Sequence, residues 1–249
     1  NMILISPAKR LSEQTVNRNL ALTEPAFKGD ADKLAKSLSK LSPKDIQSLM
    51  NVSEEIARLN HERYNNWNAS TQKERRAIFQ FEGDVFKNLD VQSLDDNDLE
   101  YMNENLRILS GIYGFLKPSD SMNPYRLEMG TKSLPENISS LYDFWGDKVA
   151  NRIKKDAGDD LIFNLASDEY FSVVKNYLDS TKVVDFKFYT EKNGSRKIIG
   201  VIAKRVRGEM ARFLISQRIK TLDPIKKFNA MGFNFLELTG NEFVFVQKS

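Results

Sequence analysis

The sequence predicts an α+β protein that folds as a single compact domain. Helical patterns are concentrated in the N-terminal half, and β-hairpin patterns lie in the C-terminal third. The regular β-α-β alternation of a doubly wound sheet is not present, and we find neither an internal repeat nor a Gly/Ser-rich linker. A chain of 249 residues can bury one large core. We therefore treat residues 1–249 as one domain.

The first half of the chain reads as a strand followed by helices. A short apolar run predicts a strand over residues 2–6. Ser42-Pro43 and Ser53 are typical helix starts, separated by a tight turn at Asn51-Val52. Apolar spacing and these signals predict helices over residues 30–41, 44–50, 53–65, 71–81, 84–89 and 95–106.

The second half mixes strands, short helices and hairpins. Asn193-Gly194 and the Thr239-Gly240-Asn241 turn are strong hairpin signals. We expect strands or extended segments over residues 107–115, 125–129, 161–166, 182–191, 196–204, 233–238 and 242–247. We expect helices over residues 140–156, 168–174 and 208–220.

A basic segment near the C-terminus predicts an anion site. The apolar residues 198–203 indicate a strand that leads into Lys204, Arg205 and Arg207, and a helix carrying Arg212 follows from Gly208. A helix N-terminus presents free N–H groups and the positive end of the helix dipole, so added cations favour phosphate there. A solvated basic face is the alternative interpretation.

The charge distribution supports a local rather than a uniform basic surface. Residues 182–249 contain 14 Lys and Arg against 6 Asp and Glu, a balance of +8. Residues 1–181 contain the other 23 Lys and Arg and the other 28 Asp and Glu, a balance of −5. The net charge of the whole chain is therefore +3. A basic quarter on a mildly acidic body indicates a patch for a polyanion.

Composition excludes several function classes. The chain has no cysteine and a single histidine, His61, so disulfides, thiolate metal sites and two-histidine metal sites cannot form. There is no P-loop and no GxGxxG after a strand, and we expect no cofactor and no metal. No apolar run approaches the ~20 residues of a membrane helix, and the N-terminus lacks a signal-peptide pattern. We expect a cytoplasmic protein without a membrane partner.

Polar residues that follow predicted strands are candidates for a site. Lys9 follows the first strand, and Arg126 and Glu128 share one face of an extended segment. Asp168 and Glu169 follow another strand. Each also has a purely structural interpretation, as a surface lysine, an exposed ion pair or helix-capping residues. The helical pair 44–50 and 53–65 could likewise aim backbone N–H groups at a DNA phosphate or simply be core helices.

Six segments in register along the chain carry a resemblance. They are residues 5–9 (ISPAK), 109–114 (LSGIYG), 124–130 (PYRLEMG), 144–147 (FWGD), 164–170 (NLASDEY) and 204–213 (KRVRGEMARF). Together they resemble the YaaA family of peroxide-stress-resistance proteins, over residues 2–246.

The resemblance implies a bacterial cytosolic protein that limits peroxide damage, associated with lower free iron and less Fenton chemistry at DNA. It implies an unusual, cantaloupe-like single-domain fold with a positively charged cleft. It also implies double-stranded DNA binding through a helix-hairpin-helix-like element at residues 41–64. The hairpin here contains no glycine, unlike the usual pattern, although Asn51 tolerates the left-handed conformation.

Two functions follow as hypotheses. In the first, the chain binds DNA largely without sequence specificity and needs no catalytic residue. In the second, the cleft is an enzyme pocket for a small phosphorylated or nucleotide ligand, with Arg126 and Arg207 holding the anion and Glu128 or Glu169 as general acid or base. The residues expected to bind phosphate are Lys9, Arg126, Lys204, Arg205, Arg207 and Arg212, with the hairpin residues Asn51, Val52 and Ser53.

Overall fold

The computed structural model describes residues 1–68 and 75–249 and confirms an α+β fold with a mixed sheet. In the large sheet the strands run in the order β11-β12-β9-β8-β1-β4-β5, with β10 paired to β9. The strands are β1 (Met2–Ile5), β4 (Leu106–Ser110), β5 (Gly114–Leu116), β8 (Ile162–Leu165), β9 (Val183–Lys192), β10 (Ser195–Lys197), β11 (Phe233–Thr239) and β12 (Glu242–Lys248). Two small two-stranded sheets join β2 (Arg10–Leu11) to β3 (Phe81–Glu82) and β6 (Lys132–Leu134) to β7 (Ile138–Ser140).

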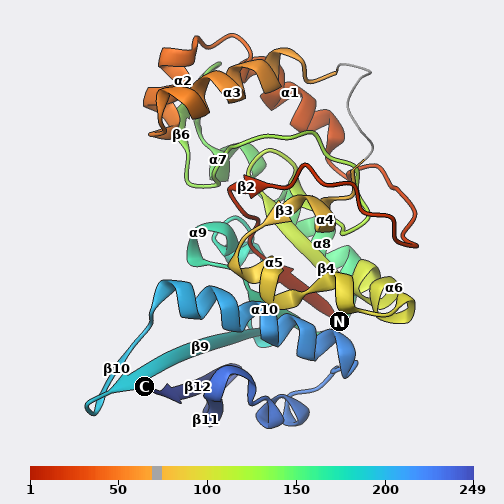
Figure 1. Ribbon diagram of the computed structural model, residues 1–249, viewed down its shortest axis with the longest axis vertical. Coiled ribbons are helices and arrows are strands. Elements are labelled where there is room, and N and C mark those ends of the chain that lie inside the picture. Colours follow the sequence, from red (N-terminus) through yellow and green to blue (C-terminus); the bar gives the residue numbers. More distant parts are fainter. Residues whose placement is uncertain (69–74) are drawn as a thin grey trace.

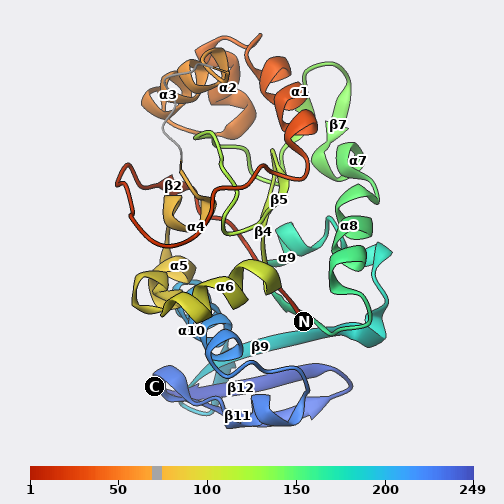
Figure 2. The same cartoon turned by 90° about the vertical axis from the view of Figure 1, so that its right-hand side faces the viewer.

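The helices form a separate cap and two layers around the sheet. In chain order they are α1 (Lys28–Leu38), α2 (Pro43–Met50), α3 (Glu54–Asn65), α4 (Ala77–Gln80), α5 (Asp84–Leu89), α6 (Asp96–Asn105), α7 (Leu141–Trp145), α8 (Lys148–Ala157), α9 (Asp168–Phe171) and α10 (Gly200–Ser216). Helices α1, α2 and α3 gather at one end of the molecule, and β9, β11 and β12 lie at the other (Figure 1). Figure 2 shows the central strands between α5, α6 and α10 on one side and α7 and α8 on the other.

The centre of the sheet is parallel, and this sets the position of the site. Strand β1 is parallel to both β4 and β8, β8 is parallel to β9, and β9 is parallel to β12. The carboxyl ends of parallel strands meet at one edge of a sheet, where polar loops gather. The register also places Asn164 beside Asp185 and Asp185 beside Glu242, which forms a polar row across three strands.

Aromatic packing holds α10 against the sheet. The ring of Phe188 on β9 lies 5.6 Å from the ring of Phe245 on β12. The Phe228 ring packs against both of these rings. It also lies 5.5 Å from the Phe213 ring of α10. Such ring pairs add to the stability gained from burial alone. The basic helix is therefore anchored on one side by an apolar core.

Several sequence predictions are confirmed in detail. Ser42 and Ser53 cap α2 and α3, and Ser42 forms a full capping box with Asp45. Ser167 caps α9. The helix over residues 84–89 and the C-terminal hairpin of β11 and β12 are also present.

Other predictions were wrong. The segment 198–203 is not a strand: after the Asn193-Gly194 turn β10 ends at Lys197, and α10 begins at Gly200. The helix expected over residues 140–156 is two helices, because the backbone turns at Gly146 with φ 50°. The segment 125–129 was expected only to be extended, and its residues 125–128 pair with no strand in the described part of the chain. Of the helix expected over residues 71–81, residues 71–74 lie outside the described residues and only Ala77–Gln80 is helical beyond them.

Candidate functional site

Polar side chains gather beyond the carboxyl ends of β1, β4 and β8. The backbone N–H of Ser167 donates to Ser6 Oγ at 2.8 Å, which joins the ends of β8 and β1. At the end of β4, Ser110 Oγ and the Tyr125 hydroxyl lie 2.6 Å apart. Hydrogen bonds therefore join the ends of β1 and β8 to each other, and the end of β4 to the segment that begins at Tyr125.

Residues 125–130 pass directly over this edge. A Cβ atom on Gly111 would lie 2.2 Å from the Leu127 carbonyl oxygen, so only glycine allows the segment to approach β4 so closely. Its far end is fixed by Gly130, whose N–H donates to Glu169 Oε2 at 2.9 Å. These contacts explain why an irregular segment is held in a defined position without strand pairing.

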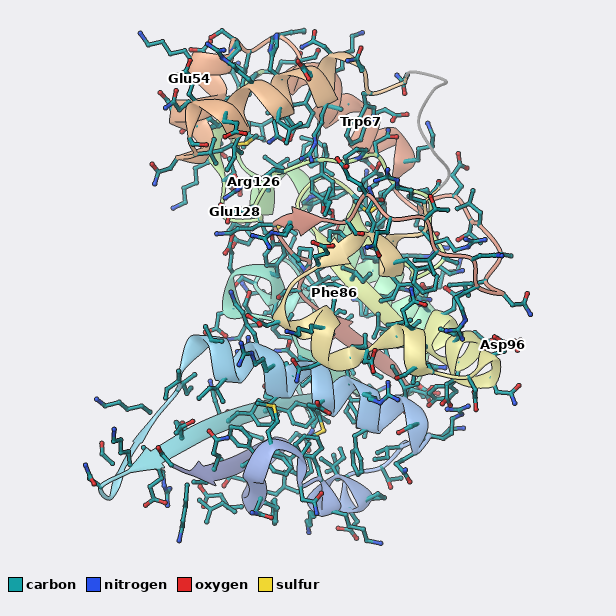
Figure 3. The ribbon with its side chains drawn as sticks, in the orientation of Figure 1. Glu54, Trp67, Phe86, Asp96, Arg126 and Glu128 are labelled. Atoms are coloured by element: carbon teal, nitrogen blue, oxygen red, sulfur yellow. The ribbon has the colours of Figure 1, made fainter. Side chains whose placement is uncertain are left out.

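Arg126 and Glu128 project from this segment in different environments. Lys9 Nζ and Glu128 Oε1, far apart in the sequence, form an ion pair at 2.9 Å. Arg126 Nε is buried and has no partner among the described residues. Figure 3 shows both side chains between the α1–α3 cap and α9. Tyr64 of α3 donates to the Arg126 carbonyl oxygen, which ties the segment to the cap.

The two carboxylates considered as acid or base both have structural partners. Glu169 is exposed and holds Gly130, and its own carbonyl oxygen accepts from the Tyr142 hydroxyl at 2.7 Å. The Glu128 side chain is 31% exposed and paired with Lys9. Tyr170 is the more perturbed group, because burial and the nearby Tyr125 and Glu169 raise its pKa. Both glutamates are at least partly exposed to solvent.

The cations of α10 do not form one cluster at a helix start. Helix α10 contains all four predicted cations, which are Lys204, Arg205, Arg207 and Arg212. The expected junction of a strand with a helix N-terminus at Gly208 therefore does not exist. Arg205 Nε lies 3.2 Å from Asp84 Oδ1, and Arg212 Nη1 donates to the carbonyl oxygens of Leu89 and Asp90. Lys204 is exposed. Two of the four cations therefore hold α10 against α5.

Arg207 points to the other side of α10, into a cavity of about 530 Å³. Among the described residues nothing forms a hydrogen bond or ion pair with its guanidinium group. Burial lowers the pKa of Arg207, and attraction to Asp168 opposes that shift only in part. The cavity is lined by Asn164, Ala166, Ser167, Asp168, Phe171, Ser172, Lys175, Asp185, Phe186, Lys187, Phe188, Ile198, Ala203, Arg207 and Glu242.

Sequence reasoning missed most of this lining. Lys175, Asp185 and Lys187 are not among the sequence candidates, and Asp168 is a candidate for which helix capping is the alternative interpretation. Asp185 and Lys187 lie on β9, in a segment that sequence patterns describe only as one arm of a hairpin. The parallel pairing of β8 with β9, which sets Asn164 beside Asp185, is a tertiary feature without a local signal.

The turn between α2 and α3 has the geometry expected from its sequence. Asn51 adopts the left-handed conformation, with φ 50° and ψ 56°. The Ser53 hydroxyl accepts from the Ile56 N–H at 3.2 Å. Asn51 and Ser53 are exposed and Val52 is half-buried. The turn between α2 and α3 is thus at the surface of the protein.

The fold and this polar edge define the class: an α+β protein whose polar side chains gather at the ends of parallel strands. Comparison with known proteins gives the family. The model of the family described as "Peroxide stress protein YaaA" matches residues 2–238. A UPF0246 protein of Aliivibrio fischeri is 43% identical over 241 residues, which cover 95% of this chain and 93% of the relative. A UPF0246 protein of Clostridium beijerinckii is 41% identical over 246 residues, which cover 97% of this chain and 95% of the relative. The chain belongs to the peroxide stress protein YaaA family.

One structural finding bears on membranes. Within residues 1–68 and 75–249, none of the helices combines the length and the apolar character that crossing a bilayer requires.

Proposed function

We propose that this peroxide stress protein binds double-stranded DNA through phosphate contacts, largely without sequence specificity, and thereby limits iron-dependent damage to DNA. The observation that carries the proposal is the exposed turn between α2 and α3. The N–H groups in the first turn of a helix have no acceptor within that helix, so the start of α3 can donate to a phosphate. The left-handed Asn51 gives the tight reversal that such an element needs.

The side of the molecule that carries this turn also carries free or exchangeable cations. Figure 3 shows Glu54, at the start of α3, on the same side as Arg126 and Glu128. Lys9, which pairs with Glu128, has a side chain that is 65% exposed. An exposed ion pair contributes little stability, so Lys9 can exchange its carboxylate for a phosphate at low cost. Glu54 is itself paired with Arg58 at 2.6 Å, which reduces repulsion at the turn.

We propose fewer phosphate contacts than the sequence predicts, because three of the expected arginines are engaged elsewhere or face a cavity. Arg205 and Arg212 already have partners on α5, and Arg207 faces a cavity. The remaining contacts are Lys9, Arg126, Lys204 and the backbone of residues 51–53. About 3–4 neutralised phosphates give a slope of log affinity against log salt of about −3.

The test is fluorescence anisotropy with labelled duplexes of unrelated sequence across a salt series. We expect similar affinities for all duplexes and the slope of about −3. Lys9→Gln and Lys204→Gln should each reduce the slope by about 1, because each removes one phosphate contact. Lys155→Gln on α8, an exposed lysine outside this surface, is the matched control and should leave the slope unchanged. A slope near zero would refute the proposal.

A second variant tests the turn itself. Val52→Glu places a carboxylate beside the proposed phosphate position and should weaken duplex binding by about tenfold through like-charge repulsion. Asn151→Glu on α8, at an exposed neutral position, adds the same single negative charge elsewhere and is the control. Equal effects of the two variants would show that the turn does not contact DNA.

A further inference from the structure

The Arg207 cavity, defined by the lining residues given above, lies where β8 ends and β9 continues. Strand β8 pairs with β9 only from Ile162 to Asn164, whereas β9 runs on to Lys192. The space left beyond β8 is closed by α9 on one side and by α10 on the other. Sites in open sheets lie in this kind of crevice, outside the carboxyl end of a strand. A volume of about 530 Å³ suits a small molecule and is too confined for a duplex.

Among the described residues, Arg207 contributes an unpaired cation to this cavity. Its guanidinium is half-buried, and the described residues supply neither an acceptor nor an ion-pair partner. Buried charges in folded proteins are ordinarily paired, because desolvation of an unpaired charge is costly. Arg107 is the contrasting case: it is buried against Asp156 at 3.3 Å and donates to three carbonyl oxygens.

The rest of the lining restricts the chemistry of the ligand. Asp168 attracts Arg207 but lies beyond ion-pair distance, which leaves room for a group between them. Asp185 already accepts from Asn164 Nδ2 at 2.9 Å. Ile198 lines the cavity with 49% of its surface exposed. A matching ligand carries an anionic group for Arg207, a hydrogen-bond donor for Asp168 and an apolar part for Ile198.

We propose that the Arg207 cavity binds a small organic anion, a phosphate or carboxylate that also bears a hydroxyl or amino group facing Asp168. Arginine suits this role because its planar fork of donors matches phosphate and carboxylate oxygens in pairs. This proposal does not depend on DNA binding: Lys204 belongs to the proposed DNA surface, whereas Arg207, three residues further along α10, lines the cavity.

The experiment is isothermal titration calorimetry of the whole chain with inorganic phosphate and, in a second arm, with acetate. We expect one of the two anions to bind, which also identifies the anionic group. Arg207→Gln should weaken binding of that anion by about tenfold, the loss of a charge-assisted pair of hydrogen bonds. Arg205→Gln removes the same charge two residues away on the same helix, outside the cavity, and should change the affinity less than twofold.

A conservative variant separates geometry from charge. Arg207→Lys keeps the charge but loses the fork, and should recover part of the affinity that Arg207→Gln loses. Thermal unfolding of each variant checks that it folds. The proposal is overturned if the wild-type chain binds neither anion, or if Arg207→Gln binds as tightly as the wild type. In either case duplex binding by anisotropy is unaffected, so the two proposals fail independently.

Discussion

The two sides of α10 use the same kind of residue for different purposes. On the side facing α5, Arg205 pairs with Asp84 and Arg212 donates to two carbonyl oxygens of the chain that leaves α5. On the side facing the sheet, Arg207 has no partner among the described residues and opens into a cavity. A run of cations on one helix is therefore not one functional patch. The packing of the helix decides which cation stabilises the fold and which remains free for a ligand.

The largest expected effect is at the close contact that fixes α10 on α5. A Cβ atom on Gly208 would lie 2.2 Å from the Val85 carbonyl oxygen, so Gly208→Ala must push the helices apart. We expect the free energy of unfolding to fall by about 3 kcal/mol, as for other overpacked cores. Urea unfolding followed by circular dichroism measures it.

Gly200→Ala is the matched control for this variant. Gly200 begins the same helix, and an added Cβ would have no neighbour within 4 Å. This variant should leave the free energy of unfolding unchanged or raise it by up to about 1 kcal/mol, because alanine favours helix. Equal stability of the Gly208→Ala and Gly200→Ala variants would contradict the close contact between α10 and α5.

A smaller effect is expected at Arg212. Its guanidinium satisfies the carbonyl oxygens of Leu89 and Asp90 at the end of α5. Arg212→Gln should lower the free energy of unfolding by about 1–2 kcal/mol, because these acceptors lose a charged donor. Arg196→Gln on the exposed β10 is the control, and we expect a change within about 0.5 kcal/mol. If both variants unfold at the same urea concentration, Arg212 has no structural role.

Much of the fold was predictable because its signals are local. The capping serines Ser42, Ser53 and Ser167 act through their own helix starts, and hairpin turns are encoded in two or three residues. The start of α10 was not predictable. Ile198, Ile199 and Val201 are β-branched and favour a strand, but the packing of α10 on α5 and on the sheet overrides this preference.

Part of the candidate site was also predictable from local sequence signals. Lys9 and Glu128 follow or flank predicted strands, and the structure brings them together. The Arg207 cavity depends on β8 and β9 pairing in parallel, so Asp185 and Lys187 meet Asp168 only in three dimensions. A sequence pattern can mark the cation but cannot show which carboxylate, if any, neutralises it.

The most direct test of this account compares the free energies of unfolding of Arg205→Gln and Arg207→Gln in a buffer without phosphate or acetate. Arg205→Gln loses an exposed ion pair and should be destabilised by about 0.5 kcal/mol. Arg207→Gln removes a half-buried charge that has no partner among the described residues, and should be as stable as the wild type or more stable by about 0.5 kcal/mol. A clear loss of stability in Arg207→Gln would contradict the claim that Arg207 is held free for a ligand.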